Sequence, residues 1–295
     1  MPFVKKTNTH IFINVGHRQI RLRRRFLPRI RMFGPTIHFV HVVEPRNPGD
    51  MLCYPYLYFK KYFRRFNVHI HHTKDIKFES IRANDIVILA SGGCFEVLDS
   101  FQESINRLLD MCDNVIAWGC GHNSHHGRPV YCPIDFEKFK LLSVRDYQYG
   151  NQRYVPCVSC MMPQLDAQYP AVRRIGVIEH QDFPIDIDAD KINHKIGISE
   201  IMRFIGGSQI IITNTYHCAY WAMLMGKKVI LYKPFSTKFD NFRHQPVTYT
   251  GNLEQDIAKC ETYPDFLAEC RDLNMEFFED VRRVIAGRKL AKKAK

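Results

Sequence analysis

The sequence of 295 residues contains no apolar run long enough to cross a membrane and no opening typical of a secretory leader. A membrane-spanning helix needs about 20 apolar residues. Lys5 and Lys6 interrupt the start, and the apolar run of about 7–15 residues that a leader requires does not follow them. The ten cysteines are scattered, without the spacing of a disulfide framework, so we expect reduced thiols and a cytoplasmic location.

Acidic residues are missing from both ends of the chain. Residues 1–33 contain nine lysines and arginines and residues 282–295 contain seven, with no aspartate or glutamate in either segment. The whole chain carries a formal charge of +12, whereas residues 34–281 carry −4 from 26 basic and 30 acidic residues. Because the basic residues are confined to the ends and accompany no nucleic-acid motif, we expect no nucleic-acid partner.

The basic ends have two interpretations. Arginines alternate with apolar side chains in residues 21–32, as in a segment that lies on an anionic membrane surface. A solvated charge run that only aids solubility is the alternative. The first interpretation predicts a peripheral protein at the inner face of the membrane.

Common cofactor motifs are also missing. The turn at Gly92 and Gly93 lacks both the GxGxxG spacing of a dinucleotide site and the lysine of a P-loop, which disfavours NAD binding and ATP hydrolysis. The single CxxC, Cys157 and Cys160, has no second pair at zinc-finger spacing and is more typical of a buried turn. The histidines at 122, 125 and 126 have no carboxylate at useful spacing, so the sequence predicts no metal and no cofactor.

Short apolar runs rich in β-branched residues alternate with helix-length segments, which predicts an α/β fold with parallel sheets covered on both faces. In the first half we expect strands at 36–43, 68–72, 85–90, 114–118 and 141–144. We expect helices between them at 51–66, 95–112 and 135–140. In the second half we expect strands at 174–178, 209–213 and 228–232, helices at 199–205 and 217–225, and final helices over 253–286 broken at Pro264. This pattern predicts two Rossmann-like, doubly wound halves that face a cleft, residues 1–150 and 151–295, with C-terminal helices.

Ligands of such sheets bind at the carboxyl ends of the strands, so polar residues there are the candidates for a site. In the first half they are Asn47, Gly49, Asp50, Gly92, Gly93, Arg145 and Asp146. Asp50 is equally typical of a helix N-cap, and Arg145 with Asp146 is equally typical of a structural ion pair.

In the second half, His180 follows one strand, and another runs into Asn214, Thr215, Tyr216 and His217 at the start of a helix. A protonated histidine at a helix N-terminus is electrostatically unfavourable. We therefore expect His217 to meet a negatively charged donor, with Lys238 reaching the same anion from the loop after the next strand.

These segments together resemble the polysaccharide pyruvyltransferase family. Six motifs carry the likeness, and they occur in the family's order over residues 36–245. They are Asn47–Asp50, Gly92–Gly93, Ala117–Gly121, Ser143–Asp146, Val155–Cys160 and Tyr216–His217 with Lys238–Phe239. The resemblance implies a two-domain fold like that of GT-B glycosyltransferases. It also implies transfer of pyruvate from phosphoenolpyruvate to a sugar as a ketal, usually on a lipid-linked glycan.

One departure from the family bears on the donor. Many members have Arg-Leu-His where this chain has Thr215-Tyr216-His217, and the resemblance implies that this arginine holds the carboxylate or phosphate of the donor. Threonine cannot replace a guanidinium group. Either Arg145, Lys238 or Arg243 supplies the charge instead, or the donor is different, in which case a nucleotide sugar is the alternative. A degenerate, non-catalytic binding protein is a third reading.

The resemblance implies these roles. His217 or His180 gives the proton to the enolpyruvate methylene, and Asp50 or Asp146 takes the proton of the sugar hydroxyl. The donor is held by Lys238 and Arg145 with Asn214, Thr215 and Tyr216. The acceptor, a glycan or lipid-linked sugar, lies beside Asn47, Gly49, Gly92, Gly93 and Asp146.

Overall fold

The computed structural model describes residues 10–15, 18–23, 35–90, 92–96, 100–125 and 132–287. The chain divides into two compact units, residues 1–34 and residues 35–295. In the first unit, strands β1 (His10–Val15) and β2 (Arg18–Arg23) pair in antiparallel fashion. Most of the basic segment 21–32, the basic tail from residue 288 and His126 lie outside the described residues.

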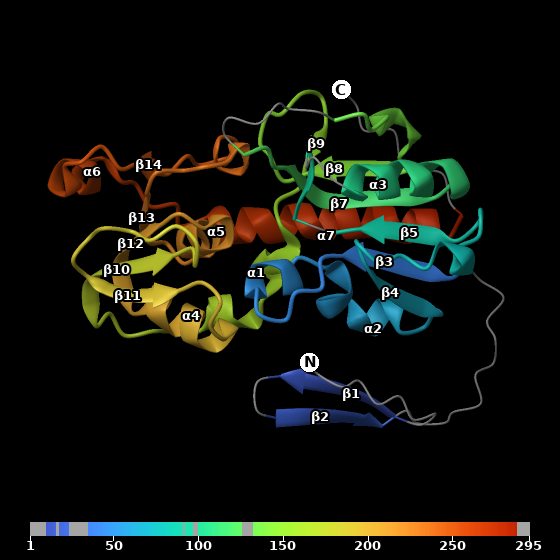
Figure 1. Cartoon of the computed structure of the whole chain (residues 1–295), viewed down its shortest axis with the longest axis horizontal. Helices are drawn as coiled ribbons and strands as arrows, with labels where there is room; N and C mark the ends of the chain where they lie inside the picture. Colours follow the sequence, from blue (N-terminus) through green and yellow to red (C-terminus); the bar gives the residue numbers. More distant parts are fainter. Residues whose placement is uncertain are drawn as a thin grey trace. The chain divides into compact units, whose positions relative to one another are not determined.

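The second unit contains two parallel sheets (Figure 1), so the α/β class with parallel sheets is confirmed. The first sheet has the strand order β4-β3-β5-β7-β8-β9, and β6 also pairs with β7. Its strands are β3 (Ile37–His41), β4 (Val68–His72), β5 (Ile86–Leu89), β6 (Gly93–Phe95), β7 (Val115–His122), β8 (Leu141–Val144) and β9 (Arg153–Tyr154). Five of them occupy the five strands predicted for this half.

The second sheet has the order β11-β10-β12-β13-β14. Its strands are β10 (Arg173–Glu179), β11 (Asp190–Asn193), β12 (Ser208–Thr213), β13 (Lys228–Leu231) and β14 (Val247–Thr248). In each sheet the second strand along the chain, β4 or β11, pairs on one side of the first strand, β3 or β10. Apart from the short β6, the later strands are added in order on the other side. Each therefore has a switch point, between β3 and β5 and between β10 and β12, where ligands of doubly wound sheets bind.

Helices cover the sheets. The α-helices are α1 (Pro48–Met51), α2 (Lys60–Phe63), α3 (Ser100–Met111), α4 (Ile198–Gly206), α5 (Tyr216–Leu224), α6 (Leu253–Lys259) and α7 (Phe266–Ile285). The 3-10 helices are η1 (Pro55–Leu57), η2 (Phe78–Ser80), η3 (Phe136–Lys138), η4 (Val158–Met161), η5 (Pro163–Asp166) and η6 (Thr237–Phe239). Among the described residues, none of these helices is both long and apolar enough to cross a membrane.

Helix α7 contributes to the hydrophobic cores of both sheets (Figure 1). Its first residue, Phe266, belongs to the core around α5, and Phe277 and Val281 belong to the core under the first sheet, with Phe39 and Trp118. The helix interruption predicted at Pro264 is confirmed, because α6 ends at Lys259 and α7 begins at Phe266.

The predicted helix 51–66 is wrong. The segment forms α1, η1 and α2, each of three or four residues. Pro55 has no N–H to donate, and it restricts the residue before it to extended backbone. Tyr54 accordingly has φ −112° and ψ 128°, which breaks the helix.

The predicted helices 95–112 and 135–140 are also too long. Phe95 belongs to strand β6, and Glu96 has φ 63°, a left-handed conformation from which a helix does not continue, so α3 begins only at Ser100. In the second segment, the Asp135 side chain accepts the Glu137 N–H and caps a single 3-10 turn, η3.

Candidate functional site

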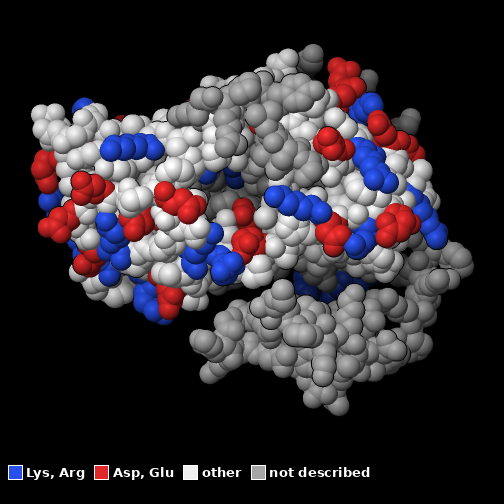
Figure 2. Space-filling model, in the orientation of Figure 1, with Lys and Arg blue, Asp and Glu red and all other residues white. Residues whose placement is uncertain are grey.

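A cavity of about 440 Å³ lies at the carboxyl ends of strands from both sheets. Its lining comes from the ends of, or the loops after, β3, β4, β5, β7, β8, β10, β11 and β12, and from α3 and η6, and so includes both switch points. The residues that line it are Val42, Glu44, Asn47, Gly49, Asp50, His72, Lys74, Gly93, Phe101, Asn123, Arg145, His180, His194, Tyr216, His217 and Lys238. Figure 2 shows a hollow near the middle of this face of the body, with basic and acidic side chains around it.

The structure brings most of the predicted site residues together. Those that line the cavity are Asn47, Gly49, Asp50, Gly93, Arg145, His180, Tyr216, His217 and Lys238. Gly92, Asp146, Asn214 and Thr215 do not line it.

Those four residues support the loops around the cavity. Asn214 accepts the His180 N–H at 2.8 Å through Oδ1 and donates to the Phe183 carbonyl at 2.7 Å, which holds the end of β10 in place. The Asp146 carboxylate accepts both the backbone N–H and Nδ1 of buried His122, at 2.7 and 2.9 Å. Asp146 is therefore engaged away from the cavity, where the sequence had suggested an acceptor-side role.

Thr215 and Gly92 shape the backbone. Thr215 is the N-cap of α5, and its N–H donates to Thr213 Oγ1 at 3.1 Å. Gly92 has φ 59°, a left-handed conformation that glycine adopts without strain.

Arg145 is a buried cation with free hydrogen-bonding capacity. Its side chain lies over the Tyr216 ring, with Cζ 3.8 Å from the ring centroid, and the residue is only 4% exposed. The guanidinium group also lies against the backbone of Gly121, where a Cβ atom would overlap Nε. Nε and Nη1 are buried and have no hydrogen-bond partner among the described residues. Because an unpaired buried charge is costly, this arrangement favours an anion in the cavity.

Lys238 adds a second cation. It belongs to η6, where Ser236 Oγ accepts its backbone N–H, and its ammonium nitrogen lies 4.6 and 5.0 Å from the ring centroids of Phe235 and Phe239. Burial, together with the nearby charge of Arg145, lowers the pKa of Lys238 to about 8, while Asp50 acts in the opposite direction. Lys238 is therefore charged at neutral pH but loses its proton in mildly alkaline solution.

Asp50 is the carboxylate of the cavity. The N-cap of α1 is Asn47 and not Asp50: Asn47 Oδ1 accepts the Gly49 N–H, and Asn47 Nδ2 donates to Asp50 Oδ2 at 2.7 Å. Burial raises the pKa of Asp50, while His217, Lys238 and Arg145 oppose that shift. A carboxylate of raised basicity beside three basic side chains can accept a proton from a bound hydroxyl.

His217 lies between the cavity and two buried thiols. Its Nε2 is 3.2 Å from Cys53 Sγ and 3.7 Å from Cys157 Sγ, although Cys53 and His217 are 164 residues apart in sequence. The ring fits only because residue 49 is glycine, since a Cβ there would overlap His217 Nδ1. With Nε2 engaged by sulfur, Nδ1 is the ring nitrogen left for a ligand.

The two thiols differ. The Cys53 thiol donates to the Gly49 carbonyl at 2.7 Å. The pKa of Cys157 is held well below its ordinary value, chiefly by its interaction with Cys53 and further by hydrogen bonds from His217 and Ser159. The pKa of Cys53 is raised, chiefly by the same pairing with Cys157. Cys157 is therefore the more acidic thiol of the pair.

His180 is the other predicted catalytic histidine. It stacks on His194, with centroids 4.6 Å apart, and burial lowers its pKa, helped by the charge of Lys238. The Asp182 N–H donates to His180 Nδ1 at 3.2 Å, so the proton of the neutral ring is on Nε2. Neutral His180 is better suited to donating a hydrogen bond than to acting as a strong acid.

Sequence reasoning missed several residues of the site. Cys53 and Cys157 are separated from His217 by long stretches of chain and share no local pattern with it. Glu44 and Asn123 follow predicted strands and His72 ends one, so these residues could have been found by position. Two groups among the described residues have ligand atoms close enough to hold a metal ion, within 4.8 Å of one another: Cys53 with Cys157 and His217, and His38 with His69 and His71. The sequence had predicted none.

No family model matches this chain, and no curated protein matches it either. Among solved structures, the chain is similar to a functionally uncharacterised protein from Klebsiella pneumoniae subsp. pneumoniae NTUH-K2044. The TM-score is 0.46 and the identity 16%, over 67% of this chain and 83% of the other. The resemblance to the pyruvyltransferases consequently depends on the motifs of the sequence.

Proposed function

We propose that the protein is a transferase that moves a pyruvyl group from phosphoenolpyruvate to a sugar, forming a ketal on a polysaccharide or lipid-linked glycan. The observation that carries the proposal is the buried Arg145, whose Nε and Nη1 have no hydrogen-bond partner among the described residues, together with Lys238 in the same cavity. Phosphoenolpyruvate has a carboxylate and a phosphate, and two cations complement them. Arg145 then takes the place of the arginine that Thr215 cannot replace.

The architecture proposed for this function is GT-B-like, with halves that meet near residues 150 and 151. In support, the first sheet uses strands from β3 to β9 and the second those from β10 to β14, and the cavity takes its lining from both. The donor would lie by Arg145, Tyr216 and Lys238. The acceptor would lie by Asn47, Gly49 and Gly93.

The chemistry needs a proton at the donor methylene, a base for the sugar hydroxyls and stabilisation of the departing phosphate. His217, whose Nε2 faces the Cys53 and Cys157 thiols, gives a proton from Nδ1 to the methylene carbon, so that the adjacent carbon becomes electrophilic. One sugar hydroxyl adds to that carbon and loses its proton to Asp50. A second hydroxyl of the same sugar then displaces phosphate and completes the ketal. The proton of this hydroxyl leaves with the phosphate, which Lys238 and Arg145 stabilise, and the proton on Asp50 returns to solvent.

Titration with phosphoenolpyruvate tests the donor. We expect phosphoenolpyruvate to bind and to raise the melting temperature, because a ligand of the native state stabilises it by mass action. Stabilisation by a UDP-, GDP- or CMP-sugar instead would favour the alternative, a nucleotide-sugar glycosyltransferase. Binding of neither class would favour a non-catalytic binding protein.

Arg145→Lys tests the anion site directly. We expect phosphoenolpyruvate affinity to fall by about 10–100-fold, because lysine keeps a charge but loses the planar set of donors. Arg243→Lys is the matched control, since Arg243 does not line the cavity and pairs with Glu269 at 3.3 Å. Equal affinities of wild type and Arg145→Lys would remove Arg145 from the donor site.

His217→Ala is expected to abolish transfer while the circular dichroism spectrum and the binding of phosphoenolpyruvate persist. Phosphate release in the presence of acceptor measures this. A variant that transfers at the wild-type rate would exclude His217 as the acid.

A further inference from the structure

Three histidines converge on one face of the first sheet, outside the lining of the cavity. In the register of the parallel strands β3 and β4, His38 is opposite His69 and Val40 is opposite His71. Side chains two residues apart on a strand point to the same face. His38, His69 and His71 therefore share a face at the edge of the sheet, because β4 is the edge strand.

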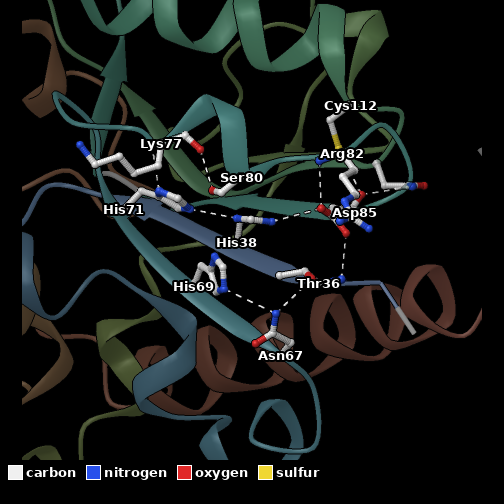
Figure 3. Close-up of polar contacts among 11 residues, drawn as sticks. Thr36, His38, Asn67, His69, His71, Lys77, Ser80, Arg82, Asp85 and Cys112 are labelled. Atoms are coloured by element: carbon white, nitrogen blue, oxygen red, sulfur yellow. Dashed lines mark hydrogen bonds and ion pairs between the residues drawn. The ribbon is translucent and has the colours of Figure 1, made fainter. Parts of the chain in front are cut away.

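Their ring nitrogens approach one another closely (Figure 3). His38 Nδ1 lies 2.9 Å from His71 Nε2, and the His69 ring stands edge-on to that of His38, with centroids 5.1 Å apart. One nitrogen of each ring lies within 4.8 Å of the others. His38 and His71 are buried and His69 is half-buried, so the cluster can be reached from solvent on the His69 side.

The far nitrogen of His38 meets a fixed carboxylate. His38 Nε2 is 3.3 Å from Asp85 Oδ2, and the carboxylate also accepts the N–H groups of Thr36 and Arg82, each at 2.9 Å. A histidine that binds a metal through one nitrogen typically donates the other N–H to a carboxylate, which fixes its tautomer and orientation. Asp85 stands in that position relative to His38 Nδ1 (Figure 3).

We propose that His38 Nδ1, His71 Nε2 and a ring nitrogen of His69 bind a divalent transition metal, with Zn²⁺ as the ion whose chemistry they fit best. Zn²⁺ takes three imidazole ligands and a water in tetrahedral sites. Its nitrogen distances of about 2.0–2.1 Å place tetrahedral ligand nitrogens roughly 3.3 Å apart, so the 2.9 Å between His38 Nδ1 and His71 Nε2 has to widen slightly when the ion binds. Cu²⁺ and Ni²⁺ share this preference for imidazole. The ion would tie the edge strand β4 to β3.

Burial favours the neutral form of two of the ligands, His38 and His71. The pKa of His71 is lowered to about 4 and that of His38 is also lowered, in both cases chiefly by burial. Asp85 opposes this at His38, and Asp75 and Glu79 oppose it at His71. Neutral imidazole is the form that binds a metal.

One hydrogen bond must change when the ion binds. The Lys77 N–H donates to His71 Nδ1 at 3.2 Å, so His71 without metal carries its proton on Nε2, facing His38. A metal on Nε2 requires the proton to move to Nδ1, where it would face the Lys77 N–H. Lys77 lies in an exposed turn before η2, and rotation of that peptide relieves the conflict.

Binding of Zn²⁺ and Co²⁺ to the full chain, after removal of metals with a chelator, tests the proposal. We expect one tight Zn²⁺ site by titration calorimetry and visible absorption bands of tetrahedral Co²⁺ without the strong near-ultraviolet band that thiolate ligands give. His69→Ala should weaken binding by at least about tenfold. Its ring is partly exposed and stands outside the hydrogen bonds that join Asp85, His38 and His71, so the variant should fold.

His217→Ala separates this cluster from the other one. It removes a ligand from the group with Cys53 and Cys157 and should leave the nitrogen-ligated site intact. Loss of binding in His217→Ala with full retention in His69→Ala would overturn the proposal, as would the absence of any Zn²⁺ or Co²⁺ binding to the wild type. In the second case the histidines form only a structural hydrogen-bond network.

Discussion

At the scale of single residues, the candidate site combines cations that differ in how firmly they hold their protons. Arg145 keeps its charge at every relevant pH because guanidinium does not deprotonate in proteins. Lys238 does not, since burial and the charge of Arg145 lower its pKa to about 8. A ligand that needs both charges is therefore bound in a pH-dependent way.

We predict that phosphoenolpyruvate affinity falls as the pH rises through about 8. Below this value Lys238 is protonated and pairs with the anion. Well above it the affinity should decrease by up to about tenfold per pH unit, because binding then requires the uptake of one proton. The ligand does not contribute to this change, since a phosphate monoester has its second pKa near 6 and is fully ionised in this range. Calorimetric titration between pH 7 and 9.5 measures the effect.

Variants of Lys238 provide the control for that profile. Lys238→Arg should bind across the whole range without the decrease, and Lys238→Gln should bind weakly at every pH. A wild-type profile that is flat between pH 7 and 9.5 would show that Lys238 does not bind the donor.

At the scale of the elements, helix α7 joins parts of the chain that carry the site. Asn274 is fully buried in it: its Oδ1 accepts Trp118 Nε1–H from β7 at 2.9 Å, and its Nδ2 donates to the Pro156 and Cys270 carbonyls at 3.1 and 2.9 Å. The Pro156 contact holds the segment that presents Cys157 to His217.

We predict that Asn274→Ala lowers the free energy of unfolding by about 2–4 kcal/mol, because it leaves the Trp118 N–H and the Pro156 carbonyl buried without partners. Urea denaturation followed by tryptophan fluorescence measures this. Met275→Ala, one residue along the same helix but 42% exposed, is the control and should change stability by less than about 0.5 kcal/mol. Equal losses in the two variants would contradict the role of the Asn274 hydrogen bonds.

The elements also show what could be predicted from the sequence. Strands β4 and β8 have the predicted bounds, 68–72 and 141–144, although β4 lies at an edge. Strand β11, with the sequence Asp-Lys-Ile-Asn, was missed because edge pairing to β10 forms it without an apolar pattern. The helix predicted over 51–66 failed at Pro55, a residue whose effect on the preceding backbone is local and was available in the sequence.

Only those features of the site that follow from the sheet topology could be predicted from the sequence. Parallel sheets gather the loops at the carboxyl ends of their strands, so Asp50, Arg145 and His217 were placed together correctly. Side-chain contacts between distant residues depend on side-chain directions in the folded chain, and no local spacing in the sequence encodes them. Examples are the contacts of His217 with Cys53 and Cys157 and that of His38 with His71.

At the scale of the whole molecule, the formal charge is divided unevenly. Residues 34–281 carry −4, and the excess of positive charge lies in residues 1–33 and 282–295. The cavity belongs to the acidic part, where Glu44 and Asp50 lie among its basic residues. Within the described part of the chain, the lining of the cavity includes no residue of the basic ends.

We predict that the full chain sediments with vesicles that contain anionic phospholipid and that the Arg23–Arg25 cluster contributes to this. Replacing Arg23, Arg24 and Arg25 by glutamine should weaken the association by roughly 100-fold at low salt, since each basic residue near an anionic surface contributes about 1 kcal/mol. Lys60, Lys61 and Arg64 are exposed residues of the body, and their replacement by glutamine changes the net charge equally. If vesicle association weakens equally in both triple variants, net charge alone is responsible. If it weakens in neither, the basic ends serve only solubility. A loss confined to the Arg23–Arg25 variant, absent with neutral vesicles and suppressed at high salt, would place the protein at an anionic membrane surface, where the proposed lipid-linked acceptor would be found.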